Sequence, residues 1–261
     1  MVSVVIRNRN EAVALENVLT ILKKIYSDDI AEIIIVDNNS EDNSIEIAKK
    51  FNCKIVTINY FTYGSATNIG IQHANSKYVL LLSSHAIPIG NSFFINSIKA
   101  LETSNSIAGI RYINSIENYS RAIKNNFIVE QPLQFGLMTG CAIVNKEVWE
   151  HYKFDEELVF SEDKEWSERV TKEGYKILDF NETFFYFIKR DQKSLLNRYK
   201  NETISEYTLH NKKFPSKIKI IASFLKKVII TNTKNYYKTI WYDYLILKAK
   251  FEIREKLLKN D

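Results

Sequence analysis

The sequence predicts an α/β protein, with a mostly parallel central sheet covered by helices on both faces and a helical extension at the C-terminus. Short apolar segments rich in β-branched residues alternate with helical patterns over the first hundred residues, which is typical of a parallel sheet with covering helices. After about residue 190 only helical patterns remain. With 7 Gly and 3 Pro among 261 residues, the chain lacks the composition of a linker or a fibrous protein.

The first hundred residues contain each expected element in turn. A helix over 11–25 is indicated because its apolar residues recur at helical spacing, and further helices are expected at 43–51 and 64–74. The strands are short apolar runs, and we expect them at 2–6, 33–36, 54–58 and 78–82.

The C-terminal part differs from the rest in pattern and in charge. Helices are expected at 192–210, 215–230 and 234–258. Residues 211–261 hold 13 Lys and Arg against 4 Asp and Glu, whereas residues 1–210 hold 23 against 27. This asymmetry predicts two parts, a body over 1–210 and a basic tail over 211–261.

The tail has two open interpretations. Its lysines are interleaved with aromatic and aliphatic residues at helical spacing, and such a helix suits an anionic membrane surface. The same pattern suits packing between helices, including those of a homodimer. No nucleic-acid-binding signature is present, so we expect no nucleic acid partner.

Several classes of protein are excluded by composition. An apolar content of 45% excludes intrinsic disorder, and two cysteines exclude a disulfide framework and a cysteine-rich zinc site. No phosphate loop or dinucleotide-binding glycine motif follows the first strand. The sequence shows neither a secretory signal pattern nor an apolar stretch of about 20 residues. We therefore expect a cytoplasmic protein.

Polar residues follow three of the expected strands, at 7–11, 37–40 and 83–88. In a parallel sheet of this kind, ligands bind outside the carboxyl ends of the strands. Arg, Asn, Glu and Asp in these segments form a hydrogen-bonding set suited to a base and a ribose.

Five segments in order resemble the family 2 glycosyltransferases: VSVVIRNRNE at 2–11, IIVDNNSEDNS at 34–44, YGSATNIG at 63–70, LSSHAIP at 82–88 and SED at 161–163. The match runs over about residues 1–210, which the resemblance identifies as the catalytic domain. It implies a Rossmann-like GT-A fold, a nucleoside-diphospho-sugar donor and inversion at the anomeric carbon.

The resemblance assigns donor-binding roles to residues in the first three segments. Asn8, Arg9 and Glu11 are expected to line the base and ribose, and Asp37 to accept a hydrogen bond from the base. Asp37 also suits a turn or the N-cap of the next helix. Asn68 either reaches the donor or bonds a neighbouring strand end.

The position of the family's Asp-x-Asp metal motif holds Ser83 and His85, as in a rhamnosyltransferase-like branch. His85 and Ser83 are therefore assigned to the donor, and His85 to a Mn²⁺ or Mg²⁺ ion, since imidazole is a suitable ligand for manganese. Phe187 stands where the family often has a histidine. Lys189 and Arg190 follow it, and they either neutralise the diphosphate directly or lie in a solvated loop. Metal dependence stays open.

The segment at 161–163 matches the catalytic-base position. Asp163 shares a helix face with Trp166 and Val170, and Gly174 is expected to end that helix. Asp163 is thus the expected general base, although acids in a first turn also complement the helix dipole.

On the acceptor side we place Gly140, Glu162 and Trp166. For Trp166 the alternative is ordinary core packing, and for Gly140 a bulged strand. Cys141 is expected to be packed.

The resulting prediction is an inverting hexosyl or deoxyhexosyl transferase using a UDP-, dTDP- or GDP-linked sugar. The acceptor would be a hydroxyl of a glycan or lipid-linked glycan in bacterial capsule, O-antigen or lipopolysaccharide synthesis, with the enzyme peripheral at the inner face of the membrane. The alternative is a sugar-nucleotide-binding module without turnover.

Overall fold

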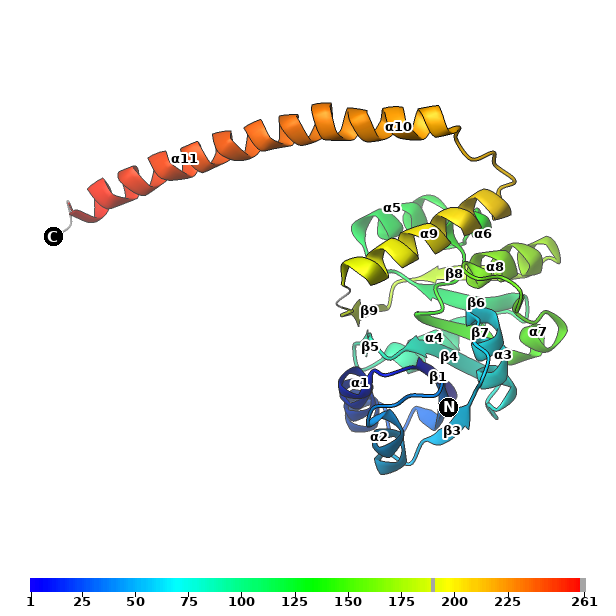
Figure 1. The fold of residues 1–261 in the computed structure, drawn as a ribbon. Coiled ribbons are helices and arrows are strands. Elements are labelled where there is room, and N and C mark those ends of the chain that lie inside the picture. Colours follow the sequence, from blue (N-terminus) through cyan, green and yellow to red (C-terminus); the bar gives the residue numbers. More distant parts are fainter. Residues whose placement is uncertain (189–190, 259–261) are drawn as a thin grey trace. The chain divides into compact units, whose positions relative to one another are not determined.

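The computed structural model describes residues 1–188 and 191–258 of the chain (Figure 1). The chain divides into two compact units, Met1–Lys212 and a second that begins at Lys213. The first unit contains the central sheet and all the strands that the described residues form.

A seven-stranded sheet forms the centre of the first unit, and it confirms the predicted mostly parallel α/β fold. One strand, β7, runs antiparallel to both of its neighbours. In spatial order the strands are β3 (Lys54–Thr57), β2 (Ile30–Asp37), β1 (Val2–Asn8), β4 (Tyr78–Ser83), β7 (Cys141–Asn145), β6 (Ile107–Tyr112) and β8 (Lys176–Phe180).

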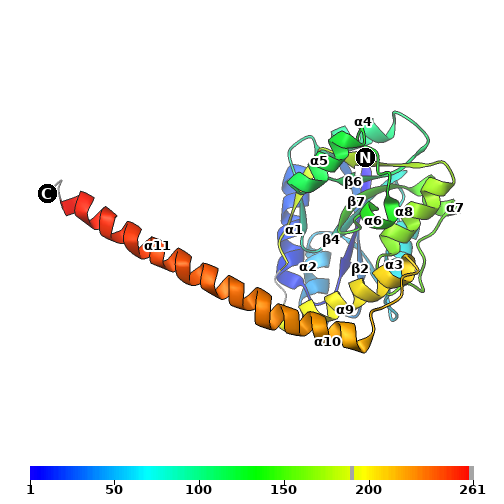
Figure 2. The same ribbon diagram turned by 90° about the horizontal axis from the view of Figure 1, so that it is seen from above.

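Helices cover both faces of this sheet (Figure 2). One apolar cluster joins the sheet to α1 (Ala12–Ile25), α2 (Ser44–Lys50) and α4 (Phe93–Leu101). A second cluster joins the opposite face to α3 (Tyr63–Gln72), α7 (Lys146–His151) and α8 (Glu162–Lys172). The first unit also contains α5 (Ile116–Lys124), α6 (Pro132–Phe135) and α9 (Gln192–Leu209).

The register of the sheet places the polar strand ends side by side. Asn8 pairs with Asp37 across β1 and β2, and Arg7 pairs with Ser83 across β1 and β4. A two-stranded antiparallel ribbon of β5 (Ala86–Ile89) and β9 (Thr183–Tyr186) follows β4. The three polar segments thus converge at one edge, as the sequence predicts.

The second unit is helical without interruption from α10 (Lys217–Leu225) through π-helical turns at Lys226–Asn232 into α11 (Thr233–Leu258), coloured orange to red in Figure 1. The predicted break between residues 230 and 234 is therefore wrong. The Thr-Asn-Thr sequence there includes neither Gly nor Pro, so nothing forces the backbone out of helical geometry. Among the described residues, no helix is long and apolar enough to span a membrane.

Candidate active site

Asp37, at the end of β2, is 1% exposed and closes the turn that follows the strand. Its Oδ1 accepts hydrogen bonds from Asn8 Nδ2 at 3.1 Å and from Ser40 Oγ at 2.6 Å, and its Oδ2 accepts one from Ser40 N at 2.8 Å. The next helix is preceded by Asn43, with Asp42 accepting from Ser44 N. Asp37 therefore forms the turn and is not the N-cap.

Asn8 leaves an unused acceptor at this edge. Its Oδ1 atom is buried and has no hydrogen-bond partner among the described residues, and such an atom normally has one. Arg9 beside it is exposed. A pocket of about 400 Å³ opens next to this strand end, lined by Asn10, Glu11, Ala12, Val13, Asp42 and Asn43. The ends of these strands thus combine a pocket with an unpaired hydrogen-bond acceptor.

Asn68 on α3 uses its whole hydrogen-bonding capacity within the protein. Its Oδ1 accepts from Trp149 Nε1 at 2.9 Å and Phe154 N at 3.0 Å, and its Nδ2 donates to Phe154 O and Glu156 Oε1, both at 2.8 Å. All hydrogen bonds of the Asn68 amide are therefore used within the protein, and none is left for a sugar-nucleotide donor. Asn68 holds the segment around Phe154 against α3, which is a structural role.

His85 follows β4 and contacts Glu11, with 3.1 Å between His85 Nε2 and Glu11 Oε1. The Ser83 hydroxyl accepts a hydrogen bond from His85 N at 3.3 Å. Phe187 packs its ring edge-on against the imidazole at 5.9 Å and donates its N–H to His85 O. Lys189 and Arg190 lie outside the described residues.

The side chains around His85 can bind a divalent cation only together with further ligands. Within the described part of the chain, no group of three His, Cys, Asp or Glu side chains is placed to hold a metal ion. His85 and Glu11 supply one imidazole nitrogen and one carboxylate. Such ions in phosphate-binding sites commonly take one or two protein ligands and complete their shell with phosphate oxygens and water. This pair therefore fits an ion that binds with a diphosphate.

The acidic pair at the start of α8 is held by two other segments. Glu162 is 3% exposed; its Oε1 lies 3.5 Å from Arg7 Nη1 and accepts a hydrogen bond from Thr139 Oγ1 at 3.0 Å. Asp163 accepts from Thr139 N at 3.4 Å. Ser161, before the helix, adopts a left-handed conformation with φ 64°, which turns the chain into α8.

Asp163 has the electrostatics of a general base. Burial raises its pKa, and the neighbouring Glu162 carboxylate raises it further, to about 7. A carboxyl group that titrates near the working pH is efficient in proton transfer because both protonation states are accessible. The arrangement can thus take a proton from a hydroxyl.

Two of the three residues assigned to the acceptor do not face an open site. Trp166 is 0% exposed, stacks on Phe154 with 5.0 Å between ring centroids and donates to Tyr152 O, so it belongs to the core. Glu162 is directed to Arg7 and Thr139. Gly140 is half-buried, and a Cβ atom there would lie 3.6 Å from the ring of Tyr186.

Arg7 and Thr139 are residues of this site to which the sequence analysis assigned no individual role. Arg7 lies one position before Asn8, and its side-chain hydrogen bonds and ion pair reach residues 60 to 155 positions away in the sequence. The only local signal was a cation directly after the apolar residues of a buried strand.

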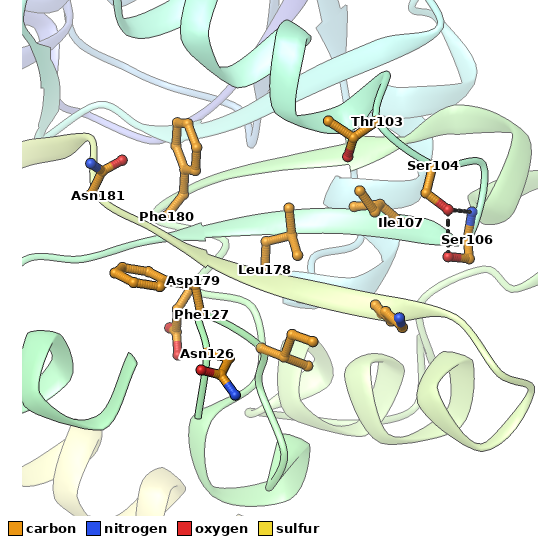
Figure 3. A pocket seen from close by; sticks show the side chains of 12 residues that line it. Thr103, Ser104, Ser106, Ile107, Asn126, Phe127, Leu178, Asp179, Phe180 and Asn181 are labelled. Atoms are coloured by element: carbon orange, nitrogen blue, oxygen red, sulfur yellow. Dashed lines mark hydrogen bonds between the residues drawn. The ribbon is translucent and has the colours of Figure 1, made fainter. Parts of the chain in front are cut away.

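A second pocket, of about 490 Å³, lies along the edge strand β8, on the far side of the sheet from β3 (Figure 3). Phe127, Leu178 and Phe180 contribute much of its apolar lining. None of the residues assigned to the donor, the acceptor or the proton transfer lines it. It is distinct from the polar strand ends.

Comparison with known proteins gives one family match. The profile of the family described as glycosyl transferase family 2 matches residues 3–186, a range that overlaps every strand of the sheet. None of the curated proteins compared with the chain matches it.

Two solved structures illustrate the fold-level similarity. A mannosyltransferase from Pyrobaculum calidifontis, in complex with GDP-Man and Mn²⁺, has a TM-score of 0.64 at 15% identity; the alignment covers 82% of this chain and 65% of that one, less than two thirds. Glucosyl-3-phosphoglycerate synthase from Mycobacterium tuberculosis, with Mn²⁺, UDP-glucose and phosphoglyceric acid, has a TM-score of 0.61 at 15% identity, covering 82% and 81%. Both support the GT-A fold.

Proposed function

The chain belongs to glycosyl transferase family 2, and from this membership we propose that it transfers a hexosyl or deoxyhexosyl group from a nucleoside-diphospho-sugar to a hydroxyl of a glycan or lipid-linked glycan. The reaction inverts the anomeric carbon. Asp163 is the general base, and the process served is the synthesis of a bacterial surface polysaccharide.

The observation that carries this proposal is the acidic pair at the start of α8. Asp163 has a pKa raised to about 7, and its neighbour Glu162 is engaged by Arg7 and Thr139. A module that only bound a sugar nucleotide would have no use for a carboxyl group tuned to accept a proton. This favours an enzyme over the binding module.

The donor base is proposed to bind at the ends of β1 and β2. The unpaired Asn8 Oδ1 is an acceptor for a ring N–H or an exocyclic amino group, and the adjacent pocket beside Glu11 offers space. Asp37 contributes by fixing Asn8 and the turn. Arg9, exposed at the same edge, is available to the ribose or the diphosphate.

A divalent ion, if the enzyme uses one as the similar structures do, would be held by His85 and Glu11. It would supply positive charge against the leaving diphosphate. The residues of the chain provide the remaining functions. Asp163 takes the proton from the attacking hydroxyl, while the diphosphate departs from the opposite face of the sugar ring.

Donor binding is tested first with thermal unfolding of the full chain in the presence of UDP, dTDP or GDP, each with Mn²⁺ and with a chelator. A ligand that binds only the native state raises the unfolding temperature. We expect one nucleotide to raise it more than the others. A shift that disappears with chelator supports His85 and Glu11 as ligands of the ion; no shift with any nucleotide contradicts the proposed donor class.

Transfer is tested with Asp163→Asn, using release of the nucleoside diphosphate in the presence of acceptor glycans. Loss of a general base lowers kcat by at least about 100-fold, and the nucleotide-induced shift in unfolding temperature stays. The matched control is Glu168→Gln, an acid on the same helix that pairs with Lys172 at the surface and should retain activity. Unchanged transfer by Asp163→Asn would refute the base assignment.

A further inference from the structure

Arg7 is a mostly buried cation that contacts three separate parts of the fold. Its side chain is 13% exposed. Nη1 donates to Thr67 Oγ1 on α3 at 3.1 Å, and Nη2 donates to Thr139 O at 3.0 Å and to Thr139 Oγ1 at 3.2 Å. The guanidinium carbon lies 5.2 Å from the centre of the Tyr63 ring. Such packing fixes a long side chain in one place.

These contacts form a directed chain of hydrogen bonds that ends at the acidic pair. The Thr139 hydroxyl accepts from Arg7 and donates to Glu162 Oε1, while the Thr139 N–H donates to Asp163 Oδ2. Arg7 also lies 3.5 Å from Glu162 Oε1 directly. Thr139 therefore contacts the cation and both carboxylates.

We propose that Arg7 is a positioning residue that acts through Thr139 and Glu162 to place Asp163 and to set the pH at which Asp163 accepts a proton. This inference rests on the proposed function, because it assigns the role through the base of that reaction. In this proposal Arg7 acts through Thr139 and Glu162 and not by direct contact with the substrate.

The physical reason is the charge balance of the pair. Two carboxylates in adjacent positions at the partly buried start of a helix repel each other, so one of them holds its proton to higher pH. The guanidinium offsets part of this repulsion by facing Glu162. Without it, the last proton of the pair would leave at a higher pH, and the base would be in its protonated, inactive form at neutrality.

The other charged groups around Asp163 are few. On α8 itself they are Glu162 and Lys164. From the sheet, Arg111 on β6 interacts electrostatically with Asp163, and it is also ion-paired to Asp179 on β8. The packed helix α6 has no charged residue, and α3 contributes the phenol of Tyr63. Lys164 thus acts on Asp163, whereas Arg7 is the cation that lies within ion-pair distance of Glu162 in the part of the chain that the structure describes.

The first test variant is Arg7→Met, which removes the charge and keeps an unbranched stem against Tyr63. We expect the inflection of the pH–kcat profile to move up by about one unit or more; a rise of one unit from a pKa of about 7 corresponds to roughly a fivefold loss of kcat at pH 7, because the ionised fraction of Asp163 falls from about one half to about one eleventh. Activity should recover as the pH is raised. The KM for the donor should stay within about twofold, since the substitution should not alter how the donor binds in its ground state.

The second variant, Glu162→Gln, should move the inflection in the opposite direction. It removes the negative charge beside Asp163 and leaves Arg7 in place, so Asp163 should lose its proton at a lower pH. The matched control is Thr67→Val, which removes an uncharged hydrogen-bond partner of Arg7 and should leave the inflection unmoved.

Titration of Asp163 is also followed without turnover, by the carboxyl ¹³C signals of aspartate-labelled full-length protein, assigned with Asp163→Asn. Opposite shifts in the two variants support the role of Arg7; if Arg7→Met does not fold, a downward shift in Glu162→Gln still supports the charge coupling. An unmoved titration, or a higher donor KM with an unmoved titration, overturns the proposal. Shifted titrations in a protein without transferase activity would instead contradict the proposed function and leave the role of Arg7 intact.

Discussion

Two carboxyl groups of this protein, the half-buried Asp163 and the buried Asp179, lie in contrasting surroundings. Asp163 lies beside the acidic Glu162, and its pKa is raised to about 7. Asp179 is 0% exposed, and its Oδ1 lies 2.5 Å from Arg121 Nη2 and 3.4 Å from Arg111 Nε. One acid faces another acid, and the other faces two cations.

The difference teaches that burial alone does not make a carboxyl group a base. Around Asp179 the two arginines are themselves fixed by the fold: Arg111 also donates to Phe135 O and Gly136 O, and Arg121 stacks on the Phe135 ring at 4.3 Å. That cluster joins β8 to β6 and to α5 and α6. At Asp163 the neighbouring charge has the opposite effect and leaves the group ready to accept a proton.

The largest effect on stability is expected for Asp179→Asn. It leaves the buried Arg111 and the half-buried Arg121 without their counter-ion, and breaking a buried pair in this way costs about 3–5 kcal/mol. We expect a clearly lower midpoint of urea unfolding, and transfer activity per folded molecule close to wild type. A midpoint like that of the wild type would mean that Asp179 and Asp163 are not as different as their contacts indicate.

Asp163→Asn should change stability in the opposite direction. The pKa of Asp163 is about 7 in the folded chain, against 3.8 for an ordinary aspartate side chain, so between these values the native state binds more protons than the unfolded state. Its contribution to stability therefore falls as the pH rises through that window. The uncharged amide of Asn removes this loss of stability. At pH 8 the variant should therefore unfold several degrees above wild type, since about 1 kcal/mol corresponds to roughly 2–4 °C in a protein of this size. Near pH 4 the two unfolding temperatures should be the same.

The measurement is thermal unfolding of both proteins at a series of pH values. A difference that is constant from pH 4 to pH 8 would contradict the raised pKa, since an uncharged effect of the substitution has no pH dependence. Together with the loss of transfer, a gain in stability at pH 8 would mark Asp163 as a residue kept for chemistry at a cost in stability.

The sheet could be predicted because its strands are continuous apolar runs whose pattern is local. β1, β2, β3 and β4 all overlap the predicted segments, and α8 ends before Gly174 with φ 89° as expected. The helical continuation through residues 231–233 was missed because it depends on the absence of a helix-breaking residue, which is a weak signal.

The parts of the site that could not be predicted depend on contacts between distant residues. Asn68 bonds residues more than 80 positions away, and Arg7 contacts a carboxylate 155 positions away. Nothing in the residues around Asn68 or Trp166 indicates that their polar atoms are satisfied inside the fold. The place of Asp163 in the first turn of a helix could be predicted, because acids there next to an inward apolar face form a local pattern; its role as the general base stays a proposal.

The smallest effect on the stability of the first unit is expected from removing the tail. The charges of the tail differ in their surroundings from both Asp163 and Asp179. Large apolar side chains from Ile218 to Ile253 are exposed, and residues 211–261 hold 13 Lys and Arg against 4 Asp and Glu. We propose that this helix lies on an anionic membrane surface, because lysines flanking aromatic and aliphatic residues combine electrostatic attraction with apolar insertion.

A chain ending at Lys212 should unfold at nearly the temperature of the full chain, because the core lies within the first unit. Its binding to vesicles containing phosphatidylserine should fall, as measured by co-sedimentation, and binding of the full chain should weaken between low and high salt because surface charges are screened. Unchanged vesicle binding, accompanied by conversion of dimers to monomers in light scattering, would assign the tail to self-association instead.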